Sequence, residues 1–149
     1  MNGAISKKTG ILSIFFIAIM TFALSLPLTC YGAEYSMSVD FSPKIINIDS
    51  QRWGEIRVFT NMRYSTFVAD GDSVFIYFNG GADSVPNIWG TRDSWGNLIL
   101  KFTLEDLLAV ESDLLVDALN SADVVVVMNN GDEYSGSDDE VYIMDKQAR

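Results

Sequence analysis

The sequence predicts an all-β fold, an antiparallel β-sandwich of immunoglobulin type with about seven strands and a short helical crossover near residues 104–119. Three observations support this prediction. Short runs rich in β-branched and aromatic residues recur along the chain. Turn-forming pairs such as Asn-Gly and Asp-Gly separate these runs. A single segment departs from this pattern and carries leucines at helical spacing.

The expected strands cover residues 37–48, 54–60, 73–79, 97–103, 122–129 and 139–145. Residues 54–60 alternate between apolar and polar side chains, as in a strand with one face in the core. Residues 122–129 are apolar almost throughout, which predicts a central buried strand. Pro43 predicts an edge or a change of sheet within the first strand. Residues 61–72 are expected to be irregular, and Asn129–Asp132 is the strongest hairpin signal in the chain.

The leucine-rich segment 104–122 predicts one or two short helical turns that cross from one sheet to the other. Thr103 is expected to cap the first turn, with Asp106 as its partner in a capping box. Ser112 offers a second start. We interpret the leucines as a cover over one end of the core rather than as a helix that binds a partner.

The N-terminus has the order of regions found in a secretory signal peptide, which we assign to residues 1–33. Lys7 and Lys8 precede an uncharged apolar run at 11–28, and small residues follow it. Cleavage after Gly32 or after Ala33 fits this pattern, and the sequence does not choose between them.

An uncleaved membrane anchor is the alternative, because the apolar run just reaches spanning length. Pro27 near the end of the run and the small residues beyond it favour cleavage. Lipid modification of Cys30 fits poorly, because Leu28 and Thr29 do not supply the small residues expected before such a cysteine. The protein is therefore expected to be secreted or periplasmic, with no membrane contact after cleavage.

The chain after the signal peptide is expected to form one domain over residues 34–145, followed by a polar tail at 146–149. It contains no cysteine or histidine, and eight basic residues face twenty acidic ones. The acidic balance argues against nucleic acid as a partner, since phosphates attract Lys and Arg. It equally argues against binding to an anionic lipid surface.

The absence of His and Cys limits the chemistry available to the domain. It removes thiol nucleophiles, Ser-His-Asp triads, and metal sites that need imidazole or thiolate ligands. Paired carboxylates, a Ser-Lys pair or an oxygen-ligated cation would be the remaining routes. No motif surrounds Lys44, Lys101 or Lys146, so we predict a non-catalytic protein with no catalytic residues and no cofactor.

Three segments together resemble a known module. They are "VDFSPKIINIDSQRWGEIRVFT", "GTRDSWGNLILKF" and "ADVVVVMNNGDEYSGSDDEVYI". Their order across residues 38–144 resembles an immunoglobulin-like sandwich module of bacterial and archaeal secreted proteins, a family with an Asp-rich loop before an L-x-V-K-F strand. The matching positions are mostly turns and core residues, so the resemblance implies the fold and says little about function.

The resemblance implies a calcium cradle in the loop before the L-x-V-K-F-type strand. In this chain the loop at 90–97 keeps only Asp93 and Asn97 as good oxygen donors, and Arg92 adds repulsion. Calcium takes about six to eight oxygen ligands, so we expect this loop alone to be a poor site.

A second acidic cluster lies near the C-terminus, at Asp138, Asp139 and Glu140. Asp132 and Glu133 are expected to face it across the hairpin. Carboxylates in such a cluster could hold calcium, but their spacing matches no calcium-loop pattern, and a solvated hairpin is the alternative.

Trp89, Trp95 and Asn87 form a candidate ligand site for carbohydrate. The indoles could stack on sugar rings while the amide bonds to hydroxyl groups. Alternatively, each tryptophan folds back to cover the open end of the sandwich.

The leading hypothesis is a secreted, non-catalytic interaction or structural module that binds a separate protein or cell-surface component. A carbohydrate-binding module that uses the loop tryptophans, or a weak calcium-binding domain, is the alternative. An acid-dependent hydrolase with paired carboxylates is the enzymatic alternative.

Overall fold

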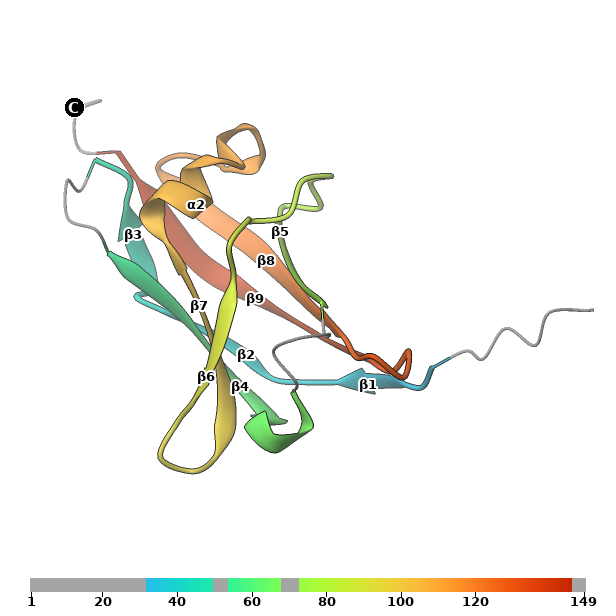
Figure 1. Cartoon of the computed structure of the whole chain (residues 1–149). Helices are drawn as coiled ribbons and strands as arrows, with labels where there is room; N and C mark the ends of the chain where they lie inside the picture. The colour runs from blue at the N-terminus through green and yellow to red at the C-terminus, as the bar shows by residue number, and fades with distance from the viewer. Residues whose placement is uncertain (1–31, 50–53, 68–72, 146–149) are drawn as a thin grey trace, which may run out of the picture. The chain divides into compact units, whose positions relative to one another are not determined.

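The computed structural model describes residues 32–49, 54–67 and 73–145, and these form a sandwich of two β-sheets (Figure 1). The predicted all-β sandwich is therefore confirmed. In these three ranges, no helix has the length and apolar character that a membrane span needs. The proposed signal peptide, Trp53, the Asp-Gly-Asp turn at 70–72 and the C-terminal tail lie largely or wholly outside the described residues.

One sheet has five strands, with β9 and β8 at its centre. Its order is β1-β9-β8-β5, and β3 pairs with another part of β9. The strands are β1 (Glu34–Ser36), β3 (Ile45–Asn47), β5 (Ser73–Phe78), β8 (Ala118–Val127) and β9 (Glu133–Met144).

The second sheet has four strands in the order β2-β4-β7-β6, all antiparallel. These are β2 (Val39–Ser42), β4 (Glu55–Arg63), β6 (Trp89–Arg92) and β7 (Asn97–Thr103), and a 3₁₀ turn, η1 (Tyr64–Thr66), follows β4.

The core lies between the sheets and is built from alternate residues of each strand. In β4 the buried positions are every second residue from Ile56 to Met62. This alternation is the pattern of a strand with one face in the core. Three buried phenylalanines from different strands meet edge to face, with ring centroids 6.0 Å apart for Phe41 and Phe78 and 6.3 Å apart for Phe41 and Phe102. This geometry is favoured for aromatic pairs.

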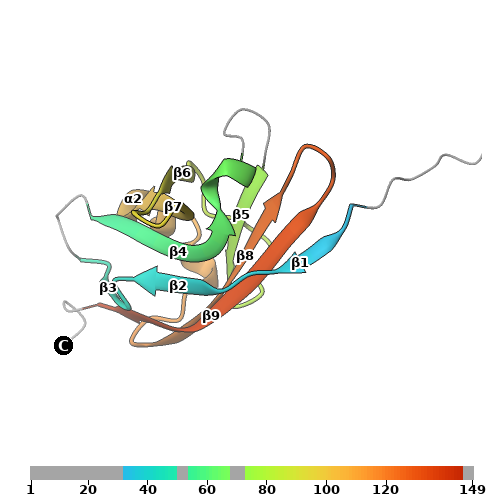
Figure 2. The ribbon, with the colours of Figure 1, turned by 90° about the horizontal axis from the view of Figure 1, so that it is seen from below.

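The N-terminal part of the chain passes from one sheet to the other and back (Figure 2). β1 runs parallel to the start of β9, β2 pairs with β4 in the other sheet, and β3 runs parallel to the end of β9. Pro43 lies between β2 and β3, so the predicted change of sheet at this residue is confirmed. A single predicted strand at 37–48 is wrong, because the two halves belong to different sheets.

The crossover between the sheets is shorter than predicted. α2 (Leu104–Leu108) and the 3₁₀ turn η2 (Glu111–Asp113) connect β7 to β8. Thr103 caps α2, and the predicted capping box with Asp106 is present. The one or two short helical turns predicted for this segment are therefore present, but the segment ends before residue 119, because β8 begins at Ala118 and its pairing with β9 outweighs the leucine spacing.

The prediction that the leucines of this segment cover the core holds for only some of them. Leu104, Leu107 and Leu114 are buried, but Leu115 and Leu119 are 54% and 60% exposed. Leu119 lies in β8 beside the buried Asn120, where strand alternation turns it outward.

Three further strand boundaries differ from the prediction. β4 continues to Arg63, because Met62 keeps the inward alternation that the irregular assignment overlooked. The segment predicted as a loop begins with β6, an edge strand whose polar residues gave no strand signal. β9 begins at Glu133 instead of 139, since half of its first residues face solvent.

β5 and β6 are edge strands on the same side of the sandwich, and only one of them has its outer edge covered. The outer edge of β5 is covered at Ile76, whose N–H donates to Ser84 Oγ (3.0 Å) and whose carbonyl accepts from Val85 N (2.9 Å). On β6, no described strand pairs with the outer edge. This side of the sandwich is therefore where a cleft can form.

Replacing Gly136 by Ala should destabilise the fold by roughly 1–3 kcal/mol, because the added methyl group overpacks the sheet crossing. A Cβ at Gly136 would lie 2.2 Å from the Met37 carbonyl oxygen and 2.8 Å from Val39 Cγ2. Urea unfolding measures the change. Ser137→Ala, at the exposed next position, is the control and should change the free energy of unfolding by less than about 0.5 kcal/mol. Equal stability of Gly136→Ala and the parent protein would contradict the close crossing.

Candidate functional site

The acidic loop between β6 and β7 is closed by its own carboxylate. Asp93 Oδ1 accepts hydrogen bonds from the backbone N–H groups of Trp95 and Asn97, both at 2.8 Å. The side-chain amide of Asn97 donates to Asp93 Oδ2 at 3.2 Å. The N–H of Asn97, together with the other donors of the loop, holds the pKa of Asp93 below its ordinary value. The two residues predicted as calcium ligands therefore bond to each other and close a turn.

The second predicted cluster is divided between the inside and the outside of the sandwich. Asp138 is buried and binds Lys44, with 2.5 Å between Oδ2 and Nζ. Asp139 is exposed and accepts from Ser121 Oγ at 2.6 Å. Glu140 is exposed, and its carboxylate lies 3.9 Å from Lys44 Nζ. The three carboxylates do not converge on one point.

Asp132 and Glu133 do not face Asp138 across the hairpin, so this expectation was wrong. Glu133 and Asp138 belong to the same strand, β9. Asp132 instead accepts from the N–H of Ala33, at the start of the described chain. Over the residues described, no group of three or more Asp, Glu, His or Cys is arranged to hold a metal ion.

The hydrogen bonds of Asp138 give this carboxylate a structural role. Oδ2 also accepts from the backbone N–H of Phe41 in β2 (2.8 Å), and Oδ1 accepts from the N–H of Glu140 (3.0 Å). Burial by itself would raise the pKa of Asp138, but these donors and Lys44 lower it below its ordinary value. The carboxylate therefore remains ionised in the folded protein at neutral pH and ties β9 to the other sheet.

The tryptophan residues predicted as a carbohydrate site separate in the structure. Trp95 lies at the tip of the β6–β7 hairpin and is 79% exposed, so it does not cover the open end of the sandwich. Trp89 lies in β6, where it pairs with Lys101 of β7, and it is 42% exposed. Asn87 lies two residues before the start of β6, so the structure brings Asn87 and Trp89 together and leaves Trp95 apart.

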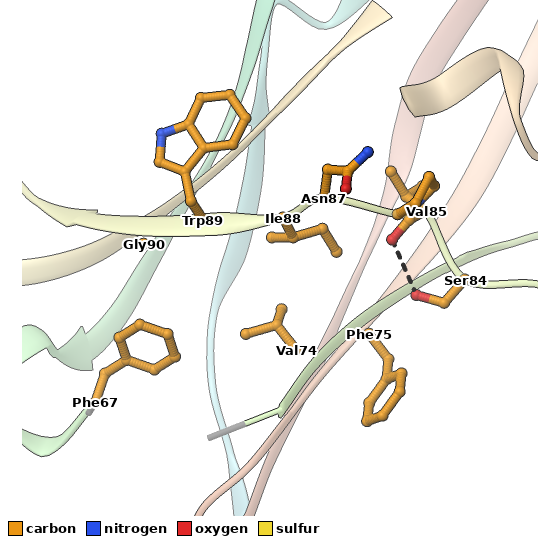
Figure 3. A pocket seen from close by; sticks show the side chains of 10 residues that line it. Phe67, Val74, Phe75, Ser84, Val85, Asn87, Ile88, Trp89 and Gly90 are labelled. Atoms are coloured by element: carbon orange, nitrogen blue, oxygen red, sulfur yellow. Dashed lines mark hydrogen bonds between the residues drawn. The ribbon is translucent and has the colours of Figure 1, made fainter. Parts of the chain in front are cut away.

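Trp89 and Asn87 border a cleft of about 520 Å³ between the edges of β5 and β6. Figure 3 shows Val74 and Ile88 pointing into this cleft from its two sides, while the indole of Trp89 projects from the opposite side of its strand. A second hollow lies next to the cleft and shares Asn87 and Trp89 with it.

We call this second hollow the Trp89 hollow. It is lined by side chains from the loop before β6, from β6 and from the start of α2, namely Pro86, Asn87, Trp89, Thr103, Glu105 and Asp106. Sequence reasoning named the first tryptophan and the asparagine, but it missed Glu105, because α2 and β6 are brought together only by the pairing of β6 with β7.

The outer face of the five-stranded sheet carries a third candidate surface, an apolar row across three strands. Ile45 and Leu119 lie on either side of Tyr142, each in register with it. Both aliphatic residues are 60% exposed. Leu115 and Val116, just before β8, are 54% and 42% exposed. Exposed apolar side chains in such a group mark interaction surfaces more often than scattered ones do.

The charges of the two sheets are separated. The described strands of the five-stranded sheet contain six acidic residues and no Lys or Arg. The basic residues on strands are all in the other sheet, at Arg57, Arg63, Arg92 and Lys101. The apolar row therefore lies on an acidic sheet.

Sequence reasoning missed the apolar row. Leu115 and Leu119 were assigned to helical turns over the core, and Ile45 to the first predicted strand, at 37–48. The signal that could have identified the row is the pairing of a β-strand pattern at 118–127 with the end of the chain, which places these residues on one face.

A scan against models of protein families finds no match, and a search of curated proteins finds none either.

Replacing Asp93 by Ala should open the hairpin tip, so we expect faster amide hydrogen exchange at Trp95 and Asn97. Asp83→Ala, an exposed carboxylate in another loop, is the control and should leave both amides unchanged. Calcium should not change the melting temperature of the parent protein or of Asp93→Ala. A saturable rise in the parent protein that Asp93→Ala abolishes would show instead that the loop holds a metal ion.

Replacing Asp138 by Asn should lower the free energy of unfolding at pH 7 by roughly 2–4 kcal/mol, somewhat less than for a fully buried ion pair because Lys44 is partly solvated. The folded-state pKa of Asp138 is lowered, so its contribution is complete above the unfolded value of ~3.9 and is lost as the pH falls through the folded value. The difference between the two proteins should therefore shrink below pH ~4.

Denaturant unfolding across this pH range measures the effect of Asp138→Asn. Glu140→Gln is the matched control, because its side chain is 81% exposed and only borders the same lysine. A constant difference between parent and Asp138→Asn at every pH would contradict the role of the ionised carboxylate.

Proposed function

We propose that this protein is a secreted, non-catalytic interaction module that binds a separate protein through the outer face of its five-stranded sheet. The observation that carries the proposal is the apolar row, where Ile45 and Leu119 are each 60% exposed beside Tyr142. Water contact with these side chains is unfavourable, so covering them would stabilise a complex.

The charge around the apolar row indicates the kind of partner. Asp123 and Glu133 share the outer face of the sheet, Asp139 lies close to the row, and the described strands of this sheet hold no basic residue to balance them. A partner with an apolar centre and a basic rim would be complementary in both respects. The phosphates of a nucleic acid would be repelled by these acidic side chains.

The strand order supports an immunoglobulin-like topology for this module. In immunoglobulin constant-type domains, one sheet has the order A-B-E-D and the other contains C, F and G. The order β2-β4-β7-β6 corresponds to the first, and β5, β8 and β9 correspond to the second. The N-terminal sequence pattern supports secretion.

The buried carboxylates support a non-catalytic role. A general acid that works near neutral pH needs a raised pKa. Burial would raise the pKa of Asp106, but hydrogen bonds from Thr103 and Asn87 lower it, as Lys44 does for Asp138. Both groups are thus stabilised as bound, ionised structural elements.

Affinity capture tests the proposal. The immobilised domain is exposed to envelope and surface proteins of the cells that produce it, and retained proteins are quantified by mass spectrometry. The double variant Ile45→Thr with Leu119→Thr removes apolar surface but keeps strand propensity. It should retain the partner at least about tenfold less, as expected for residues at the centre of an interface. Added salt should weaken the binding, because the rim is charged.

Trp95→Ala is the matched control, because it removes an exposed apolar side chain from the β6–β7 hairpin, outside the five-stranded sheet. It should retain the same partner as the parent protein. If no protein is retained, or if the double variant retains it as well as the parent does, the outer face of the five-stranded sheet is not the binding surface.

A further inference from the structure

The Trp89 hollow lies on the other sheet from the apolar row, so it can bind a ligand of its own. Its volume is about 510 Å³, within the range of small-molecule and cofactor sites. Its lining comes from three elements, the loop before β6, the strand β6 and the first turn of α2.

Trp89 supplies a fixed aromatic surface at this hollow. Its backbone is paired with Lys101 of β7, so the indole projects from a strand rather than from a loose loop. Trp89 remains 42% exposed. Figure 3 shows its indole projecting from β6 on the side opposite Ile88. An exposed indole offers a flat apolar face together with one N–H donor.

Asn87 is held in position beside the indole. Its Nδ2 donates to Asp106 Oδ1 at 2.8 Å. Asp106 is buried and is held in turn by the N–H of Thr103 at 2.8 Å and by Thr103 Oγ1. This chain of bonds fixes the amide plane of Asn87, and its carbonyl oxygen accepts no hydrogen bond from any residue that the structure describes.

Glu105 adds a second acceptor. Its side chain is exposed at the start of α2, and within the described part of the chain its carboxylate has no hydrogen bond or ion pair. The hollow thus combines an aromatic face with two unoccupied acceptors, and one of these carries a negative charge. The complementary ligand has an apolar face and several hydroxyl or amino donors, and it carries no negative charge.

We propose that the Trp89 hollow binds a neutral or amino-bearing glycan. A pyranose ring stacks on the indole of Trp89 through its C–H face, and its hydroxyl groups donate to the Asn87 carbonyl oxygen and the Glu105 carboxylate. Glycans that carry uronate or sulfate groups are repelled by Glu105.

Tryptophan fluorescence and NMR chemical shifts, titrated with cellohexaose, xylohexaose, chitosan hexamer and oligogalacturonate, test the proposal. We expect saturable binding of at least one of the first three and none of oligogalacturonate. Trp89→Ala should weaken that binding by about tenfold or more, as for a central aromatic residue in a binding site. Glu105→Gln should weaken it less and should admit the uronate, because the repulsive charge is gone.

Trp95→Ala is the matched control, because it also removes one indole but lies at the hairpin tip outside the hollow. It should leave the affinity unchanged. The proposal is overturned if none of the three uncharged or amino-bearing oligomers binds up to about 10 mM, a limit that covers weak millimolar affinities. It is also overturned if Trp95→Ala abolishes binding and Trp89→Ala does not. Either result leaves the protein-binding face of the other sheet untouched.

Discussion

The carboxylate of Asp138 joins the N-terminal strand segments to the C-terminal strand. It accepts hydrogen bonds from the Phe41 backbone in the four-stranded sheet and from Lys44 at the crossing between the sheets. The chain can leave β9 at Met37 and return to it at Ile45 only if the segment between them is held against both sheets. A buried ionised group with several donors supplies that hold, because it binds each donor more strongly than a neutral group would. Gly136, two residues earlier in β9, provides the space for the crossing.

This arrangement makes the two sides of the sandwich unequal. On the side of β2 and β9 the chain passes from one sheet to the other and back, and so holds the two sheets together. On the side of β5 and β6 the loop between these two strands joins the sheets, and a cleft lies beside it. The charges follow a separate division, between an acidic five-stranded sheet and a second sheet that holds the basic residues. One small domain thus has two distinct candidate surfaces for recognition, one flat and acidic and one concave with an aromatic wall.

The fold class and several local features could be predicted from the sequence because they depend on neighbouring residues. The capping box of Thr103 and Asp106, the strand at 97–103, the Asn-Gly hairpin and the break at Pro43 are of this kind. The features that could not be predicted from the sequence depend on pairing between distant segments. β6 has too few apolar residues to be recognised as a strand, and it exists because β7 pairs with it. The outward turn of Leu119 follows from its register with Tyr142, which no local spacing contains. The candidate glycan site was visible in part through Trp89 and Asn87, whereas Glu105 joins them only through the tertiary fold.

The cover over the edge of β5 has a consequence for the behaviour of the protein in concentrated solution. The segment SVFIYF has no charge and no proline, is rich in aromatic and β-branched residues, and so has the composition of segments that stack into cross-β fibrils. Stacking requires free N–H and carbonyl groups along the strand edge. In the folded protein Ser84 and Val85 occupy these groups at Ile76, in the middle of the segment. The loop between β5 and β6 therefore prevents other strands from adding to β5. Local opening of this loop would free the strand edge and allow aggregation before the core itself unfolds.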